Sequence, residues 1–445
     1  MANGTSRPMI IQDIPEEVIC DNIFSRLPFK LVTCLKTISQ HCCSQIKNDT
    51  MFAAKQAALC PSCPALIHTG RRDANAPYCS LGVLSSTPTT VGIPSSGLDF
   101  LDCPTDEGNF LILASSNGLL CILYQPYYRG SHLTRRHVFF IANPATRQAK
   151  AIPGASQHLR QHRAVGLVFD PSDKPASKQK FMIVQALSSF ATTNDTLANL
   201  RFVIFSSDTG CWVMSDTTIT TNIKQKYCDK VVYSGGILYW DYKENLVWFD
   251  VATSAAGVIK MPWNLQAGQG SKLDKWKDHN IDASNNGMLI CTTIDKNGLA
   301  MQRLAKRGDG YYWDLKHKKG WKDIIEMSGD TFHFCHSMNL RNGWKTKFCE
   351  RWYVRVLGLE SERWIYIGVQ QRLRTHEMVL RYDMDTCKAE NTREELRDLN
   401  EIQCRVFGYR NSMAALPTIA VPLQQDGLCE CNKSGGCVCA TKGTG

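Results

Sequence analysis

The stretch SSNGLLCILY at 115–124 decides the fold, because it places a turn glycine directly before a run of apolar residues. A turn of the Asn-Gly type followed by such a run is typical of a β-hairpin. The same arrangement returns as YSGGILYWDY at 233–242 and as SNNGMLICTTI at 284–294. Three copies of one hairpin pattern, with little helical periodicity from about residue 98 onward, predict a repeated β architecture.

A second pattern also repeats, in which a strand ends in Asp or Asn and a turn that contains Thr follows. It occurs as VFFIANPATR at 138–147, as VWFDVAT at 247–253 and as LRYDMDT at 380–386. Together the two patterns indicate repeated units of several short strands joined by turns.

The spacing of the glycines gives the size of the repeat. Gly166 lies 48 residues after Gly118, and Gly287 lies 51 residues after Gly236. Repeats of about fifty residues with four strands each are typical of kelch-like β-propellers, and radial repetition of blades leaves few exposed sheet edges. About 350 residues at this period predict about seven blades.

A propeller ring must be closed by strands from both of its ends. The closing strand expected near the C-terminus is Arg405–Tyr409, and its expected early partner is Phe110–Leu113. The interval between 166 and 236 is longer than the others, and the polar run ALSSFATTNDTLANL at 186–200 predicts a surface loop there.

The N-terminal segment 13–52 differs from the rest, because its apolar residues repeat at helical spacing. Ile19, Ile23 and Leu27 fall on one side of a helix that Pro28 ends. About forty residues cannot bury so much apolar surface by themselves. The segment is therefore expected to need a partner surface.

This segment resembles an F-box. The family's opening Leu-Pro corresponds to Ile14-Pro15, its central motif to NIFSRLP at 22–28, and its closing Phe to Phe52. Gln40 and Cys42 stand where the family usually carries Lys and Trp. The resemblance implies docking on a Skp-type adaptor. The residues implied in that contact are Ile14, Pro15, Val18, Ile23, Phe24, Leu27, Pro28, Leu31, Val32, Leu35 and Ile38.

The region 105–390 resembles the F-box-associated domain of plant F-box proteins, which is related to kelch propellers. The motifs that carry the resemblance are NGLLC at 117–121, NPATR at 143–147, GLVFDP at 166–171, SSDTGCW at 206–212 and GGILYW at 235–240. The resemblance implies the substrate-recognition subunit of a Skp–cullin–F-box ubiquitin ligase. Its partners would be the Skp-type adaptor, cullin and RING subunits beyond it, and an unidentified target protein on the propeller.

The predicted fold class is α+β multidomain, with a short helical F-box followed by an all-β, kelch-like propeller of about seven blades. The predicted division is a flexible lead at 1–12, the F-box at 13–60, a linker and irregular segment at 61–97, the propeller at 98–422 and a Cys-rich flexible tail at 423–445.

The composition is that of a globular protein, with 43% hydrophobic and 21% charged residues. No apolar run is long enough to span a bilayer, and the N-terminus lacks the apolar core of a signal peptide. We therefore expect no membrane partner, a cytoplasmic or nuclear location, and reduced thiols at the 20 cysteines. The net charge of +10 is mild over 445 residues and does not by itself argue for nucleic-acid binding.

Two other functions remain open from the sequence. One is a propeller enzyme with an accessory helical N-terminus, whose active site would be assembled from distant loops. The other is a nucleic-acid-binding propeller that uses the basic run at 316–322, although Trp321 is better explained as a blade residue with lysines solvating a loop. No hydrolase, metalloprotease or phosphate-loop signature occurs, so no enzyme activity and no cofactor are predicted.

Metal binding is the remaining question that the cysteines raise. Cys429, Cys431, Cys437 and Cys439 could supply four thiolates in the tail, but their C-x-C spacing is tighter than that of the usual zinc knuckle. The pair Cys60 and Cys63 closes a helix rather than opening one, which disfavours a redox role. No metal site is therefore predicted.

Overall fold

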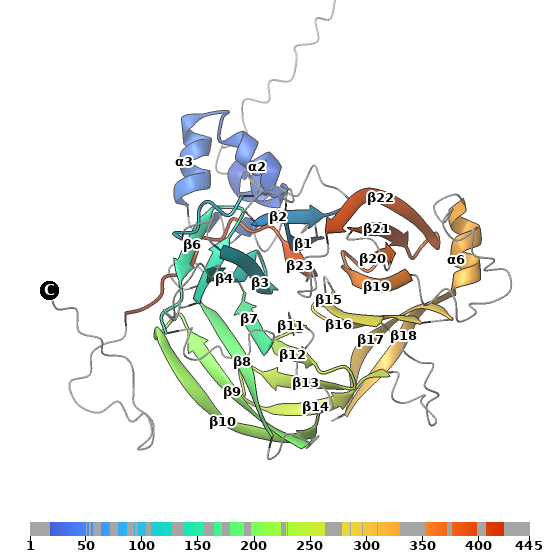
Figure 1. The fold of residues 1–445 in the computed structure, drawn as a ribbon. Coiled ribbons are helices and arrows are strands. Elements are labelled where there is room, and N and C mark those ends of the chain that lie inside the picture. Colours follow the sequence, from blue (N-terminus) through green and yellow to red (C-terminus); the bar gives the residue numbers. More distant parts are fainter. Residues whose placement is uncertain are drawn as a thin grey trace, which may run out of the picture.

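In the computed structural model of the chain, a group of short helices lies near the N-terminus and six sheets stand around one axis (Figure 1). The residues that the structure describes are 18–49, 51–52, 55–56, 64–71, 79–86, 93, 97–103, 108–126, 137–154, 164–170, 179–190, 197–223, 228, 230–262, 278–284, 286–295, 297–308, 310–329, 352–371, 376–397 and 406–421.

The N-terminal helical unit consists of short elements. They are η1 (Ile19–Ile23), η2 (Phe24–Arg26), α2 (Phe29–Leu35) and α3 (Gln40–Asn48). Pro28 separates the first turns from α2, as its missing N–H predicts. Ser39 caps α3, because its Oγ accepts a hydrogen bond from the N–H of Cys42 at 3.0 Å.

Five blades have four antiparallel strands each. Blade 1 contains β3 (Gly108–Ser116), β4 (Leu119–Pro126), β5 (Val138–Asn143) and β6 (Gln148–Ala151). Blade 2 contains β7 (Val165–Phe169), β8 (Phe181–Phe190), β9 (Leu197–Ser206) and β10 (Cys211–Asn222). Blade 3 contains β11 (Val231–Ser234), β12 (Ile237–Asp241), β13 (Asn245–Asp250) and β14 (Ala256–Lys260).

Blades 4 and 5 follow the same order from the axis outward. Blade 4 contains β15 (Asp278–Ala283), β16 (Leu289–Asp295), β17 (Gly298–Arg307) and β18 (Gly310–Gly320). Helix α6 (Trp321–Ser328) follows β18, so Trp321 opens a helix rather than lying in a blade strand. Blade 5 contains β19 (Trp352–Leu359), β20 (Trp364–Gln371), β21 (His376–Asp383) and β22 (Lys388–Arg397).

Blade 6 closes the ring and differs from the expectation. It has three strands in the order β2–β1–β23, in which β1 (Pro64–Arg71) and β2 (Cys79–Leu84) join β23 (Val406–Arg410). The closing strand near the C-terminus therefore occurs nearly where it was expected. Its partner is β1, in the segment expected to be linker, and not the strand at 110–113, which is the inner strand of blade 1.

The expected count of about seven blades is wrong, because the structure has six. The inner strands begin 47 residues apart between Val231 and Asp278 but 74 residues apart between Asp278 and Trp352. Gly118 lies in a hairpin turn whereas Gly166 lies within β7, so their spacing did not measure a whole blade. The strands β8 and β9 also occupy most of the run that was expected to be a loop.

The hairpin turns between the first two strands of blades 1 and 3 have the predicted chemistry. In the turn between β3 and β4, Asn117 and Gly118 both have positive φ, at 43° and 91°. Gly235 and Gly236 repeat this between β11 and β12, at 58° and 86°. Two positive φ angles define the turn that matches the twist of a two-residue hairpin.

After β23 the chain continues as a strap, residues 411–421, that crosses blades 1 and 2. Ala414 and Leu416 pack into the core shared by those two blades. The side-chain amide of Asn143 donates to the carbonyl oxygens of Ser412, at 3.0 Å, and Ala414, at 2.9 Å. The strap thus connects the closing strand to blade 1, on the side where the helical unit lies.

Candidate functional site

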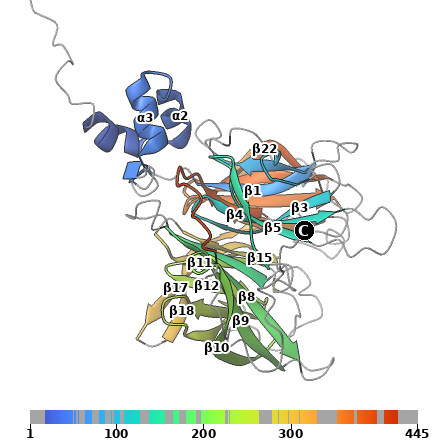
Figure 2. The same cartoon turned by 90° about the vertical axis from the view of Figure 1, so that its left-hand side faces the viewer.

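One face of the N-terminal helical unit packs against the propeller. Phe29, Val32, Ile46 and Phe52 are buried in one cluster with two propeller residues, Ala145 from the turn between β5 and β6 and Met413 from the strap. This apolar cluster holds the helices beside blade 1, and Figure 2 shows the helical unit standing out to one side of the sheets. Within the N-terminal segment, the side-chain amide of Gln56 donates to the carbonyl oxygen of Leu27 at 3.2 Å.

Four large apolar side chains of the unit are exposed. Val18 is 43% exposed, Ile23 48%, Leu31 49% and Ile38 66%. Four exposed large apolar side chains within some twenty residues make this unit a candidate for contact with another protein. We call these four residues the apolar face.

The structure divides the residues predicted to contact the adaptor. Phe24, Leu27 and Leu35 are half-buried against the cluster that faces the propeller. Val32 is fully buried there, so it supports the packing of α2 and has no surface to offer a partner. Pro28 is partly exposed beside them, and Ile14 and Pro15 lie outside the described residues.

A second candidate site lies on the propeller axis, where the inner strands end. A cavity of about 410 Å³ is bordered by the hairpin turns of blades 1, 3 and 4 and by the ends of the inner strands of blades 5 and 6. Its polar lining includes Ser115, Asp170, Lys230, Ser234, Glu360 and Arg410. We call this the axial cavity.

A network of buried polar groups forms one wall of the axial cavity. Lys230 Nζ donates to Asp282 Oδ1 at 2.5 Å and to Asn280 Oδ1 at 3.0 Å. Asp282 Oδ2 accepts from the amide of Asn280 at 3.1 Å and from the N–H of Leu359 at 2.9 Å. Burial raises the pKa of Asp282, and the nearby Lys230 ammonium opposes that shift.

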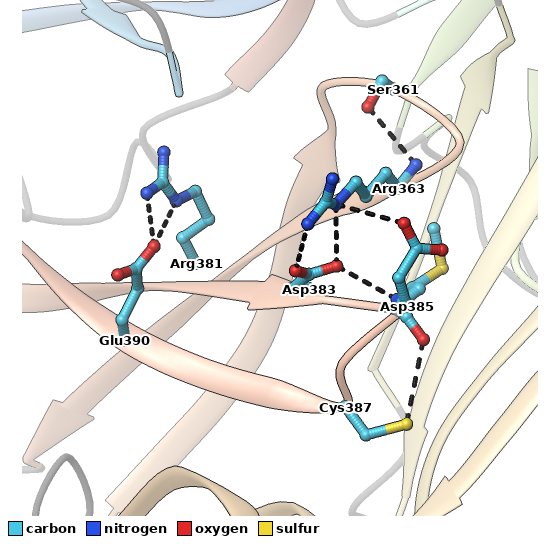
Figure 3. Close-up of polar contacts among 8 residues, drawn as sticks. Ser361, Arg363, Arg381, Asp383, Asp385, Cys387 and Glu390 are labelled. Carbon is cyan, nitrogen blue, oxygen red and sulfur yellow. Dashed lines mark hydrogen bonds and ion pairs between the residues drawn. The ribbon is translucent and has the colours of Figure 1, made fainter.

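A third polar cluster lies on blade 5 and contains Arg363, Arg381, Asp383 and Glu390 (Figure 3). The guanidinium carbons of Arg363 and Arg381 lie 4.8 Å and 4.6 Å from the centre of the Trp364 ring. Arg363 binds Asp383 through two nitrogens, at 3.0 and 2.7 Å, and Arg381 pairs with Glu390. Since each arginine already has a carboxylate, we interpret the cluster as a clamp between strands rather than as a binding site.

The basic run at 316–322 is also largely compensated. Lys316 pairs with Asp314 at 2.5 Å, Lys319 with Asp323 at 3.8 Å, and Lys322 with Glu326 at 4.0 Å. Residues 316–320 of the run belong to the outer strand β18, and residues 321–322 to α6, and not to the loop expected from the sequence. These pairs reduce the positive charge available to a nucleic acid.

The described residues bear on two further questions, metal binding and insertion into a membrane. Within the described ranges no group of three or more His, Cys, Asp or Glu side chains is placed to hold a metal ion. The tail cysteines Cys429, Cys431, Cys437 and Cys439, and the pair Cys60 and Cys63, lie outside those ranges. Among the helices that the structure describes, none is long and apolar enough to cross a membrane.

Sequence patterns missed two parts of these sites. Ala145 and Met413 join the propeller to the helices, although Ala145 lies in a quoted turn motif, because a turn motif does not tell what packs on it. Ser115 and Ser234 both lie close to the turn in two of the repeated hairpin stretches, Ser234 directly before Gly235 and Ser115 two positions before Asn117. The nearness of these residues to the hairpin turns is the one signal that could have pointed to the axial cavity.

Comparison with known proteins identifies the family. The model described as "F-box protein At3g26010-like, beta-propeller" matches residues 88–338, more than half of the chain, and begins after the helical unit. The F-box protein At5g07610 of Arabidopsis thaliana is 26% identical over 266 residues, which are 58% of this chain and 59% of that protein. The match thus spans less than two thirds of that relative's length.

Solved structures share the architecture only distantly. TolB from Acinetobacter baumannii aligns with a TM-score of 0.37 at 10% identity, over 78% of this chain and 66% of that one. A prolyl endopeptidase aligns with a TM-score of 0.29 at 12% identity, over 64% of this chain and 36% of that one. Likenesses this distant do not bear on function. The match across most of the propeller does decide the family, and the chain belongs to the At3g26010-like F-box proteins with a β-propeller.

Proposed function

We propose that this protein is the substrate-recognition subunit of a Skp–cullin–F-box ubiquitin ligase and acts in the cytoplasm or nucleus. The apolar face would bind a Skp-type adaptor, which leads to the cullin and RING subunits. The propeller would hold a protein target. In this role the chain performs no covalent chemistry, because it only raises the effective concentration of the target near the ubiquitin-loaded enzyme.

The observation that carries the proposal is the two-sided packing of the helical unit. Phe29 and Val32 are buried against the propeller. Leu31, which lies between them in the sequence, is 49% exposed. A unit that served only as a cap on blade 1 would turn its large apolar residues inward. An exposed apolar face on a docked unit instead favours a bridge between the propeller and a second protein.

The docking contact supports the same role. The helices touch the turn between β5 and β6 through Ala145, and Met413 anchors them to the strap. Asn143 holds both the turn and the strap in place. Its Oδ1 accepts a hydrogen bond from the N–H of Ala145 at 3.0 Å, and its amide donates to the carbonyl oxygen of Ser412 in the strap. An adaptor on the apolar face would therefore hold the propeller in a defined orientation.

Substitution of the apolar face tests the proposal. We expect the full-length double variant Ile23→Asp, Leu31→Asp to lose at least thirtyfold in affinity for the adaptor, because a central interface anchor contributes about 2 kcal/mol or more. The measurement is co-purification of adaptor and cullin, with affinity titrated on purified adaptor. Undiminished recovery would exclude the apolar face as the adaptor site.

The matched control is Val213→Asp, which places the same charge at an apolar side chain that is 60% exposed on β10 of blade 2. It should keep adaptor binding, and all variants should melt as the unmodified protein does. With a co-purifying target, the double variant should still bind the target but no longer shorten its half-life. A propeller enzyme or a nucleic-acid binder would instead leave the target's lifetime independent of both changes.

A further inference from the structure

The axial cavity opens at the end of the propeller where the hairpin turns lie. Gly235 and Gly236, in the turn between β11 and β12, and Gly287, in the turn between β15 and β16, line the cavity and are exposed. Since these positions carry no side chain, the backbone of another molecule can approach the rim closely. The volume of about 410 Å³ gives room for one long side chain or a small molecule, and not for a folded unit.

Most of the charged groups in the lining are engaged inside the protein. Lys230, Asp282 and Glu360 line the cavity but are buried. The Lys230 ammonium donates to Asp282 at 2.5 Å. Glu360 Oε1 accepts from the N–H of Ser86 at 2.7 Å, and its Oε2 accepts from the hydroxyl of Tyr366 at 3.1 Å. These three charges therefore join parts of the ring to one another.

Asp170 differs from them, because it is exposed. It lies directly after β7, at the end of the inner strand of blade 2. Arg410, the other charged residue of the lining, is partly buried and donates to the carbonyl oxygen of Ser284 at 3.1 Å. Three carboxylates against two cations leave an excess of negative charge in the lining, and its exposed part is Asp170.

The charge of Asp170 acts on the wall of the cavity. Tyr233 of β11 lines the cavity, and the pKa of its phenol is raised by burial and then by the negative charges of Asp170 and Asp250. A carboxylate between walls of low dielectric constant attracts a cation more strongly than the same group on an open surface. The cavity is therefore suited to a cationic group.

The cavity mouth and the helical unit lie at the same end of the propeller. In blade 1 the turn after β3 and the turn after β5 share one end, because β4 pairs antiparallel with both strands. The first turn lines the cavity through Asn117, and the second packs on the helical unit through Ala145. A partner bound at the mouth would therefore lie on the side of the propeller that carries the helical unit.

We propose that the axial cavity receives a basic side chain, lysine or arginine, of the target protein and pairs it with Asp170. An ammonium or guanidinium group forms its strongest hydrogen bonds with a carboxylate. The inference rests on the proposed function, because that function makes a protein the ligand of the propeller. It adds that a positive charge on the target is read at the axis, at the end where the adaptor would bind.

Three capped peptides test the charge preference on the full-length protein. They have the form acetyl-Gly-Ser-X-Ser-Gly-amide, in which X is arginine, its neutral isostere citrulline, or glutamate. Binding is measured by titration in saturation-transfer NMR. We expect the arginine peptide to bind at least about tenfold more tightly than the other two, because only it can form a charged pair. Equal binding of the citrulline peptide, preference for the glutamate peptide, or no binding at millimolar concentration would overturn the proposal.

Three variants assign the binding to Asp170. Asp170→Asn should weaken binding of the arginine peptide about tenfold. The control Asp216→Asn removes an exposed carboxylate from β10 of the same blade and should leave binding unchanged. Asp170→Lys should turn the preference toward the glutamate peptide, which a defect in folding would not do. Unchanged binding of the arginine peptide by Asp170→Asn would place the cation elsewhere and refute the assignment.

The source of the cation and the ligase role are tested separately. Putrescine, a free diamine, should bind more weakly than the arginine peptide, and tighter binding would assign the cavity to a free cation instead of a protein side chain. Asp170→Asn should keep adaptor co-purification, because Asp170 is not part of the apolar face. Failure of the peptide series would therefore refute the cavity inference alone, whereas undiminished adaptor binding by the double variant Ile23→Asp, Leu31→Asp would count against the proposed adaptor site.

Discussion

Blade 5 draws its four strands from one run of chain, residues 352–397, whereas the neighbouring blade 6 joins two strands from residues 64–84 to one from residues 406–410. The two blades share a core that includes Leu66, Leu357 and Val406. In blade 5 every paired strand follows its partner in the sequence. In blade 6, Ala65 faces Tyr409, which lies 344 positions further along the chain.

The difference shows where the stability of the ring depends on distant parts of the chain. Blade 5 can form its hairpins locally, and its strands are further joined by ion pairs such as Arg355 with Glu377. Blade 6 gains the pairing of β1 with β23 only after the chain has closed on itself, and such closure carries a cost in entropy. The ring should therefore be most sensitive to changes in blade 6 and least sensitive to the surface pairs of blade 5.

The largest effect is expected from removal of the closing strand. A chain that ends at residue 405 lacks β23 and the strap, which leaves the edge of β1 unpaired and exposes the cores of blades 1, 5 and 6. An open strand edge promotes association between chains. We expect a protein that aggregates and lacks a cooperative melting transition in calorimetry and light scattering.

The control is a chain that ends at residue 421, which keeps every described strand and should melt as the full chain does. A soluble protein ending at residue 405 that melts cooperatively would show that blade 6 does not close the ring. The comparison between the blades would then lose its basis.

The composite blade is also where prediction from sequence failed. The hairpins of blades 1, 3 and 4 were predictable because their turn residues, such as Asn117-Gly118, impose a local geometry. The pairing of β1 with β23 leaves no local signal, since the two strands lie far apart in the sequence. The segment 61–97 contains many turn residues, and its composition gave no indication of strands.

The candidate sites were predictable to different degrees. The helical stripe predicted that the N-terminal segment carries more apolar surface than it can bury, and Ile23 and Leu31 are exposed in the structure. The helical spacing did not predict which apolar residues of the segment are buried. Their burial depends on contact with Ala145 and Met413, which lie more than ninety positions away in the sequence. The axial cavity collects residues from all six blades, so no window of sequence contains it.

A smaller effect in blade 6 is expected from His68 in β1. Its ring lies over Gly82 of β2, and burial, aided by the positive charge of Arg355, lowers the pKa of His68 to about 4. The folded protein therefore binds fewer protons than the unfolded chain between about pH 4 and 6.5. The stability that this supplies is complete above about pH 6.5 and is lost as the pH falls, by about 2 kcal/mol at pH 5 and about 3 kcal/mol below pH 4.

Urea unfolding at pH 7.5 and at pH 5.0 measures this loss. The variant His68→Gln removes the titrating group, so its loss of stability between the two pH values should be smaller by about 2 kcal/mol. The comparison within one variant cancels the carboxylates that titrate in both proteins. Equal losses in the two proteins would show that His68 is not buried neutral in the sixth blade.

The smallest effect is expected from Arg363→Ala on blade 5. The Arg363 side chain is 50% exposed, and water and salt screen exposed pairs, so the pair with Asp383 adds little to stability. The charge still acts locally, because Arg363 holds the pKa of Asp383 at about 2. We expect a change of no more than about 2 °C in the melting temperature, while the pKa of Asp383, followed by NMR titration, rises toward the ordinary value of about 3.9. A fall of 5 °C or more in the melting temperature would show that blade 5 depends on the clamp around Trp364 as blade 6 depends on β23. The local order of the strands in the sequence would then not explain the difference between the two blades.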